Sequence, residues 1–497
     1  MSFRYLLCHS RFRGNDSVYN YGNDNDRNRN DGDKENMKIV VCASEVVPFA
    51  KTGGLADVCG ALPPALEKLG HELVIITPRY KTSNIHAPAP VVRIGENVRV
   101  CFVEHNHYFG REGLYGEAGG EYQDNLERFS YFCHESFQVL KKIKFAPDII
   151  HCHDWHTALI PVLLKTNYQN DPFFKGTRSV LTIHNLAYQG VFPKHQYGKL
   201  GIDGHVFHTQ GLEFYDQVNI LKGGIIFSDV ITTVSPQYSK EIQTEELGCA
   251  LDGVLRNRSE DIYGILNGLD YDAWNPKDDP FLDFPFGTSM VNEQKQQNKL
   301  VVQAALDLPL KEKIPVFGFV GRLCVQKGLD IIMEIIDGII GQGAQVVFSG
   351  VGDKKYHRMI EDAVLRYQGH VGKFLKFDER MAHKIYAASD FFLMPSVYEP
   401  CGLGQMIALR YGAIPIVHKT GGLADTIHLY DPIHKTGNGF VFTEYTNGSF
   451  IKAVEEALKV YKQSAQMEDL RQHALRYRFS WEKSAKEYMR VYQQCLS

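Results

Sequence analysis

The sequence lacks a long apolar run, a large excess of charge of one sign and a regular cysteine framework. Each of these would indicate a specialised class of protein. No run of 18 or more apolar residues occurs in its 497 residues, which argues against a membrane-spanning helix. Charge of neither sign is in large surplus, because 54 lysines and arginines stand against 58 aspartates and glutamates, for a net charge of −4. Non-specific binding to nucleic acid depends on a strongly basic surface. We therefore expect neither a membrane nor a nucleic acid as a partner.

Cysteine is present but forms no recognisable framework. The ten cysteines include no Cys-x-x-Cys pair, and some lie in apolar runs such as Val41-Cys42-Ala43. Secreted disulfide domains and zinc sites both depend on regularly spaced cysteines. The apolar stretch at Tyr5-Leu6-Leu7-Cys8 is too short for a secretory signal. We expect reduced thiols in a cytoplasmic protein.

The composition that remains is that of a globular protein with one exceptional segment. Apolar residues make up 44% and charged residues 23% of the chain, which excludes wholesale disorder. Residues 1–36 are mainly Asn, Asp, Gly and Arg and contain little that could be buried. Such a segment cannot offset the entropy of ordering it. We predict a disordered N-terminal extension over 1–36, and a start codon assigned too early would explain it.

From Met37 onward, short β-branched runs alternate with segments of helical period, which predicts an α/β protein. Strands that are apolar on both faces and separated by helices indicate parallel sheets covered on both sides. A Pro- and Asp-rich stretch interrupts the pattern and indicates a passage between two domains. We predict Rossmann-like domains over 37–270 and 312–475, an interdomain passage over 271–311 and a final helix within 476–497. The expected strands are 38–43, 72–77, 147–152, 179–183, 229–234, 314–320, 345–350, 373–377, 389–394, 413–418 and 439–442.

One heptapeptide occurs twice. Lys-Thr-Gly-Gly-Leu-Ala-Asp stands at 51–57 and again at 419–425, each time after a predicted strand and before a helical pattern. Glycine amides at a helix N-terminus can bind an anionic or hydroxyl-rich ligand. The identity of the two copies does not establish that they have the same role.

Two loops after predicted strands carry the side chains with the clearest chemistry. Arg322 and Lys327 lie in a glycine-flanked loop, and two cations there suit a diphosphate. Glu399 lies between a strand end and a helix that starts near Gly402, where a carboxylate can accept hydrogen bonds from sugar hydroxyls. Cys401 has no His–Asp partner in any motif, so we expect it to pack near a ligand rather than act as a nucleophile.

Histidines gather at two further strand ends. His151, His153, Asp154 and His156 resemble a metal cluster, but successive side chains of a strand point to opposite faces. We therefore favour a polar cleft lining over a metal site, and the same reading applies to His184. Metal-assisted sugar transfer commonly uses Asp-x-Asp, and the only notable one, Asp24-Asn25-Asp26, lies in the predicted extension. We predict no metal and no cofactor, with cationic side chains stabilising a leaving diphosphate instead.

Taken together, these motifs resemble glycosyltransferase family 5, the bacterial glycogen synthases and plant starch synthases. The resemblance runs from Met37 to the end of the chain and omits only the extension. It depends on motifs that occur in the family's order: 51–58, 153–156, Thr182-Ile-His-Asn-Leu-Ala-Tyr-Gln-Gly190, Asn267-Gly-Leu-Asp270, Trp274-Asn-Pro276, Arg322 with Gln326-Lys-Gly328, Glu399-Pro-Cys-Gly-Leu403 and 420–426.

The resemblance implies a GT-B fold, with two Rossmann-like domains facing across a cleft and a C-terminal helix that crosses back. It implies retaining transfer of glucose from ADP-glucose to the non-reducing 4-hydroxyl of an α-1,4-glucan such as glycogen. By the same resemblance, Arg322 and Lys327 stabilise the departing diphosphate, His184 lies beside the glucosyl 6-hydroxyl and Glu399 lies near the sugar hydroxyls. The remaining implied substrate-binding residues are Lys51, Gly53, Gly54, Asp57, Asp154, Asn267, Cys401, Gly402, Leu403, Thr420, Gly421 and Gly422.

Four positions depart from the family's usual pattern and leave alternatives open. Val397-Tyr398 replaces Arg-Phe, Gly404 replaces Thr or Ser, and Lys419 replaces Arg. These changes bear on efficiency and donor preference. The alternatives are another GT-B transferase with UDP-glucose or a different acceptor, and a non-catalytic glucan-binding relative. A glucan phosphorylase is a poorer match, because no motif for a pyridoxal-phosphate lysine is recognisable.

Overall fold

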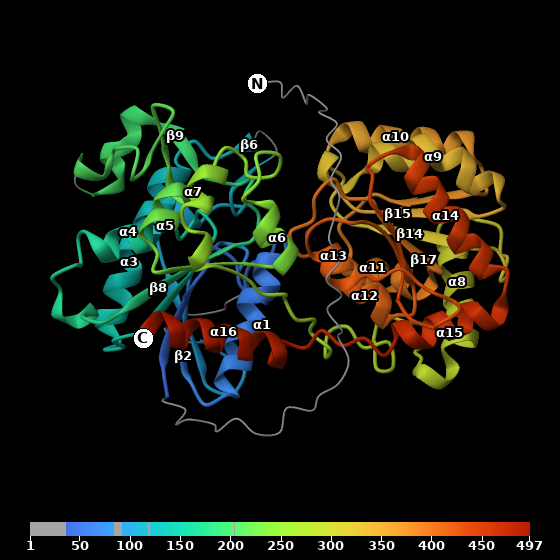
Figure 1. Ribbon diagram of the computed structural model, residues 1–497, viewed down its shortest axis with the longest axis horizontal. Coiled ribbons are helices and arrows are strands. Elements are labelled where there is room, and N and C mark those ends of the chain that lie inside the picture. Colours follow the sequence, from blue (N-terminus) through green and yellow to red (C-terminus); the bar gives the residue numbers. More distant parts are fainter. Residues whose placement is uncertain (1–35, 84–91, 118–119, 203) are drawn as a thin grey trace. The chain divides into compact units, whose positions relative to one another are not determined.

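The computed structural model of the protein describes residues 36–83, 92–117, 120–202 and 204–497, so the predicted extension lies outside the described residues except for Asn36. The first domain is built on an eight-stranded sheet of order β13-β12-β8-β7-β1-β2-β4-β3 (Figure 1). Its neighbouring strands pair in parallel, except that β3 is antiparallel to β4. The strands are β1 (Lys38–Cys42), β2 (Glu72–Pro78), β3 (Val92–Ile94), β4 (Val98–Val103), β7 (Ile149–His153), β8 (Arg178–Ile183), β12 (Val230–Thr233) and β13 (Ile262–Gly264).

Helices cover both faces of this sheet. Alternate residues of β1 show the division, because Val40 and Cys42 belong to one apolar cluster and Ile39 and Val41 to another. The first cluster includes side chains of α3 and α4, and the second includes side chains of α1 and α16. The helices of this domain are α1 (Gly54–Glu67), α2 (Asn106–Phe109), α3 (Asn125–Lys142), α4 (Leu159–Lys165), α5 (Ile220–Phe227), α6 (Pro236–Glu241) and α7 (Asp252–Arg256).

The second domain is built on a six-stranded, wholly parallel sheet of order β16-β15-β14-β17-β18-β19. Counted along the chain, this is the Rossmann order 3-2-1-4-5-6. The strands are β14 (Val316–Val320), β15 (Gln345–Ser349), β16 (Val371–Phe374), β17 (Phe391–Met394), β18 (Ile414–His418) and β19 (Phe440–Phe442). The helices are α8 (Val291–Ala305), α9 (Leu329–Gly341), α10 (Lys354–Arg366), α11 (Glu379–Ala388), α12 (Gly404–Arg410), α13 (Gly421–Thr426), α14 (Asn447–Tyr461) and α15 (Ser464–Ala474).

The predicted passage 271–311 differs from the structure, because its second half is helix α8, which packs against α11. The polar sequence there suggested a linker, yet Lys295 and Lys299 are buried. Lys295 Nζ donates to the carbonyls of Ala387 at 2.8 Å and Tyr411 at 2.9 Å. Lys299 Nζ lies 2.6 Å from Asp390 Oδ2. The helix is therefore an integral part of the second domain, held by buried lysines.

Helix α16 (Trp481–Leu496) returns to the first domain, which confirms the predicted crossover. Its buried face recurs at helical spacing, and Figure 1 shows it beside α1. Ser484 Oγ donates to the Leu266 carbonyl at 2.6 Å, and Tyr492 Oη lies 2.8 Å from His151 Nδ1. A Cβ added to Gly268 would lie 2.6 Å from Trp481 atoms, so the backbone at Gly268 and the start of the helix are in direct contact.

Most of the predicted strands are confirmed to within two residues, but the sequence patterns missed several short elements. The largest omission is β4, where Arg99 interrupts an apolar run. The others include β3, β13, a hairpin of β5 (Gly116–Glu117) with β6 (Gly120–Glu121), and a small antiparallel sheet of β9 (Val191–Pro193), β10 (Glu213–Phe214) and β11 (Gln217–Asn219). The strand expected at 373–377 is β16, which begins and ends earlier.

The sequence analysis expected neither disulfide bonds nor a membrane-spanning helix, and the described part of the chain can be compared with both expectations. The nine cysteines there are unbridged. No helix within that part is both long and apolar enough to cross a membrane.

Candidate active site

The strand orders of the two sheets define where ligands can bind. In open parallel sheets, the crevice lies at the carboxyl ends of the strands, where the strand order reverses. The reversal falls between β1 and β7 in the first sheet and between β14 and β17 in the second. The loops after these four strands carry residues 43–53, 154–158, 321–328 and 395–403. Most of the residues predicted for the site lie in these loops.

A partly buried ion pair of the second domain joins the loops after β14 and β17. Lys327 Nζ lies 2.5 Å from Glu399 Oε2, and Ser396 Oγ donates to the same oxygen at 2.9 Å. The Glu399 residue is 5% exposed, so Lys327 and Ser396 are partners of a buried carboxylate. Gly328 ends the turn at a φ of +69°, and a Cβ there would lie 1.9 Å from the Pro395 carbonyl oxygen. A glycine is therefore needed for the two loops to meet.

Arg322 extends from the same loop to the first domain. Its Nη1 lies 3.2 Å from Tyr188 Oη, in the loop that follows His184, and its Nη2 lies 3.4 Å from Gln326 Oε1. Both predicted cations are thus on one loop, one paired with a carboxylate and the other in contact with a phenol. This arrangement can supply two positive charges to a diphosphate.

The first copy of the repeated heptapeptide is built around a glutamate that sequence analysis missed. Glu45, 4% exposed, accepts from Thr52 Oγ1 at 2.6 Å, from the Thr52 amide at 2.5 Å and from the Gly53 amide at 3.3 Å. Tyr115 Oη donates to Glu45 Oε1 at 2.6 Å. Lys51 Nζ lies 2.7 Å from Asp57 Oδ1, with both side chains partly exposed. Burial raises the pKa of Asp57, and the Lys51 charge opposes that shift.

The second copy follows β18, the fifth strand of its sheet, so it is not the topological counterpart of the first. Its Gly421 amide donates at 3.0 Å to both oxygens of Glu241, which belongs to α6 of the first domain. In return, Asp425 Oδ2 accepts from the Gln237 amide of α6 at 2.9 Å. Each short helix thus has its first turn capped by a carboxylate from the other domain.

The same glycines support the loop of Glu399. The Gly422 amide donates to the Glu399 carbonyl oxygen at 3.0 Å. Thr420 is buried, and its hydroxyl lies 3.2 Å from Glu241 Oε2. The amides of Gly421 and Gly422, predicted to bind substrate, therefore donate to protein groups, and their contribution to binding stays a prediction.

We expect Gly421→Ala to lower kcat about tenfold and to lower the melting temperature. Gly421 has a φ of +43°, and an added Cβ would lie 2.0 Å from the Glu399 carbonyl oxygen. A left-handed conformation costs a non-glycine residue about 1–3 kcal/mol, and the clash displaces the Glu399 loop. Thermal unfolding and initial rates measure both effects. Gly53→Ala is the matched control for stability, because nothing lies within 4 Å of its added Cβ. Wild-type behaviour of Gly421→Ala would contradict this account.

The histidines of β7 and the residue that follows them hold the loop that carries His184. Asp154, at a φ of +56°, follows the last residue of the strand, and its Oδ1 accepts from the His184 amide at 2.7 Å. His153 Nδ1 lies 2.9 Å from His184 Nε2. His151 and His153 share one face of β7, with ring centroids 4.2 Å apart. His153 is fully buried and does not line the cleft, whereas His184 is partly exposed.

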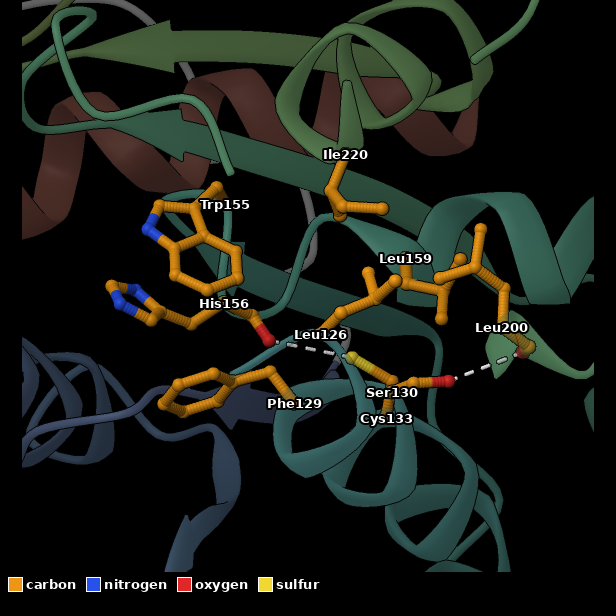
Figure 2. Close-up of a pocket in the computed structure, with 9 residues that line it drawn as sticks. All are labelled: Leu126, Phe129, Ser130, Cys133, Trp155, His156, Leu159, Leu200 and Ile220. Carbon is orange, nitrogen blue, oxygen red and sulfur yellow. Dashed lines mark hydrogen bonds between the residues drawn. The ribbon is translucent and has the colours of Figure 1, made fainter. Parts of the chain in front are cut away.

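Trp155 and His156 lie in the loop after β7 and pack in an apolar cluster, shown in Figure 2. Their ring centroids lie 4.2 Å apart, and the Phe129 ring lies 4.6 Å from that of His156. The cavity beside them holds about 10 Å³, room for one water at most, so it is no sugar site. Gly190, at a φ of +63°, lies against Trp155, because an added Cβ would be 2.4 Å from the indole. The motif 153–156 and the motif 182–190 therefore pack directly against each other.

The loop before α12 brings together five more predicted residues. Cys401 is buried against the backbone and side-chain amides of Asn267, and burial raises the pKa of its thiol to about 12. That thiol stays protonated, in agreement with a packing role. Gly402 has a φ of +74°. An added Cβ on Gly54 would lie 3.9 Å from Leu403 Cδ1, so the starts of α1 and α12 face each other.

The structure also explains one departure from the family's pattern. An added Cβ on Gly404 would lie 3.2 Å from Tyr386 Oη and 3.3 Å from Met394 Sδ. The space of a threonine or serine side chain is therefore partly taken by Tyr386, whose ring stacks on Phe392 at 4.6 Å.

Comparison with known proteins identifies the family. Residues 38–257 match the family model described as the starch synthase catalytic domain, and residues 306–473 match the one described as glycosyl transferases group 1. The glycogen synthases of Thermosipho melanesiensis and Geotalea daltonii are each 44% identical to this chain, over 93% of it and 99% of theirs. The chain belongs to the glycogen and starch synthase family. It is a glycosyltransferase that elongates glucan.

Solved structures support the same assignment. The catalytic domain of Arabidopsis thaliana starch synthase IV, bound to ADP and acarbose, superposes with a TM-score of 0.84 at 36% identity, covering 93% of this chain and 99% of that one. A sucrose-phosphate synthase from Thermosynechococcus elongatus, 17% identical, superposes with a TM-score of 0.60 over 92% of this chain and 98% of that one and shares the fold alone. The predicted GT-B fold is thus confirmed for this family member.

The site of this glycosyltransferase combines the cations Lys51, Arg322 and Lys327 with buried or partly buried carboxylates. Over the described ranges, no group of three or more His, Cys, Asp or Glu is arranged to hold a metal ion. Sequence analysis missed Glu45, Tyr115 and Glu241. Glu45 contacts the nearby Thr52 and Gly53 as well as the distant Tyr115, and Glu241 contacts the distant Gly421. Sequence analysis also missed Phe377, 80% exposed on the loop after β16 at the same edge of the sheet. Phe377 falls within the strand predicted at 373–377, so its exposure could not be read from the sequence pattern.

Proposed function

We propose that the protein transfers glucose from ADP-glucose to the non-reducing end of an α-1,4-glucan, with retention and with release of ADP. The observation that carries the proposal is the joining of Lys327 and Glu399 at the switch point of the second sheet, 2.5 Å apart. A sugar nucleotide has a diphosphate next to a sugar. The lysine suits the diphosphate, and the carboxylate beside it suits the sugar hydroxyls. The family of the chain supplies the reaction class.

Charge stabilisation by Arg322 and Lys327 drives departure of the diphosphate in this proposal. Negative charge grows on the leaving phosphate, and preorganised cations stabilise it more than they stabilise the bound donor. The leaving phosphate accepts the proton of the acceptor hydroxyl on the face of attack, which gives retention. Glu399, held by Lys327 and Ser396, is placed to accept from sugar hydroxyls rather than to attack. No metal or cofactor is part of this mechanism.

The nucleotide base has a stacking surface in the second domain. Phe377 is exposed and precedes α11, whose Glu379 lies close enough to raise the pKa of Asp57 in α1 through its charge. Nucleobases stack on exposed aromatic rings. We infer that the adenine ring of the donor packs on Phe377 while its diphosphate meets Arg322 and Lys327.

Labelled ADP-glucose incubated with glycogen and EDTA tests the proposal. We expect label in α-1,4-linked chains and one ADP released per glucose transferred. A parallel reaction with UDP-glucose tests the other donor, and faster release of UDP would favour a different GT-B transferase. Binding to glycogen without turnover of either donor would indicate a non-catalytic relative. Activity that EDTA abolishes and Mg²⁺ restores would contradict a metal-free mechanism.

A further inference from the structure

The hydrogen bond between His153 and His184 constrains which ring nitrogen of His184 carries its proton. His153 Nδ1 and His184 Nε2 lie 2.9 Å apart, so one nitrogen donates and the other accepts. Burial lowers the pKa of His153 well below its usual range and that of His184 to about 3. Both rings are therefore neutral near pH 7, and each carries a single N–H.

The surroundings of His153 decide between the two arrangements. Its residue is fully buried, and its Nε2 has no hydrogen-bond partner among the residues that the structure describes. If His184 were the donor, the proton of His153 would have to be on that unpartnered Nε2. A buried N–H without an acceptor costs about 1–3 kcal/mol and is rarer in proteins than an acceptor left unsatisfied. The proton of His153 therefore belongs on Nδ1, donated to His184.

We propose that His153 is a positioning residue that fixes His184 in its Nδ1-protonated form, so that the nitrogen left for the substrate is a hydrogen-bond donor. The proposal rests on the proposed function only in taking a sugar as the partner of His184. Nδ1 of His184 is the ring nitrogen that His153 does not occupy. An N–H at Nδ1 donates a hydrogen bond to a lone pair of a sugar oxygen. It cannot accept the proton of a sugar hydroxyl.

His153 is itself packed against a second layer, which is formed by His151 and its hydrogen-bond partners. The His151 ring packs 4.2 Å from that of His153, with its Nε2 2.5 Å from Thr182 Oγ1 and its Nδ1 2.8 Å from Tyr492 Oη of α16. This layer supplies a control, because Tyr492→Phe removes a buried hydrogen bond next to His153 and leaves the pair of His153 and His184 intact.

Two replacements of His153 separate positioning from packing. His153→Asn keeps an N–H near the place of Nδ1, whereas His153→Leu fills much of the volume without a donor. Protein labelled with ¹⁵N-histidine reports the protonated nitrogen of each ring in long-range ¹H–¹⁵N spectra, and the His184 signals are assigned as those lost in His184→Asn. Because the spectra use the free protein, they test the proposal whether or not ADP-glucose is the donor.

We expect the Nδ1-protonated form of His184 in the wild type, in His153→Asn and in Tyr492→Phe. In His153→Leu we expect the Nε2-protonated form to become populated and kcat to fall about tenfold, with His153→Asn recovering most of it. An Nε2-protonated His184 in the wild type would overturn the proposal. So would an unchanged tautomer in His153→Leu, or equal loss of kcat in the leucine and asparagine variants, since either result would indicate packing alone.

Discussion

Lys327→Ala is expected to lower kcat by about 10²- to 10³-fold. In the proposed mechanism this lysine neutralises charge that grows on the leaving diphosphate, and loss of one such preorganised donor costs about 2.7–4 kcal/mol of transition-state stabilisation. Initial rates at saturating ADP-glucose and glycogen measure the effect. A purified, folded variant with full kcat would contradict the role of Lys327.

The same substitution is also expected to lower the stability of the protein. A double variant separates this effect from the effect on kcat. Glu399, with a side chain 7% exposed, loses its ion-pair partner, and a buried charge left unpaired is strongly destabilising. We expect a lower melting temperature for Lys327→Ala. The double variant Lys327→Ala with Glu399→Gln removes the unpaired charge, so stability should recover while kcat stays low. Recovery of kcat in the double variant would show that Lys327 serves only to balance Glu399.

Glu399→Gln is expected to lower kcat about 10- to 100-fold. The amide keeps the shape of the side chain but loses the charge that fixes Lys327 and accepts strongly from sugar hydroxyls, and contacts to charged groups contribute about 1.5–3 kcal/mol. Because Lys327 is then no longer shared with a carboxylate, we expect ADP to bind more tightly and to inhibit at lower concentration. Steady-state rates and product-inhibition constants measure the two effects.

Ser396→Ala provides the matched control for that substitution. It removes only the hydrogen bond that Ser396 Oγ makes to Glu399 Oε2 at 2.9 Å and leaves the ion pair in place. We expect a smaller loss of kcat and no change in inhibition by ADP. Unchanged turnover and unchanged donor affinity in Glu399→Gln would count against the carboxylate.

Residues that follow a strand directly could be placed from the sequence. Arg322, Lys327 and Glu399 stand in loops after apolar runs, and parallel strands bring such loops to one edge of the sheet. The Rossmann-like alternation of both domains and the presence of the last helix were predictable for the same reason, since each depends on local periodicity, whereas the return of that helix to the first domain was implied only by the family resemblance. The motif order added the family, and with it the roles of individual side chains.

Contacts between distant segments could not be placed in this way. The identical heptapeptides gave no sign that Glu45 would cap one copy from a few residues away and Glu241 the other from a different domain. Lys295 and Lys299 look like surface residues of a linker until Asp390 and the carbonyls that receive them are in view. Such partners are selected by tertiary packing, and a single sequence carries no local signal for them.

The return of α16 affects the order in which the chain can fold during synthesis. The side of the first sheet that carries α1 is completed by Trp481, Tyr488 and Tyr492, which share an apolar cluster with Ile39 and Val41. A ribosome therefore finishes the whole second domain before the first can bury that side. Domains usually fold as units in the order of their synthesis. Here the first half of the protein must wait for the last, with an apolar surface exposed until then.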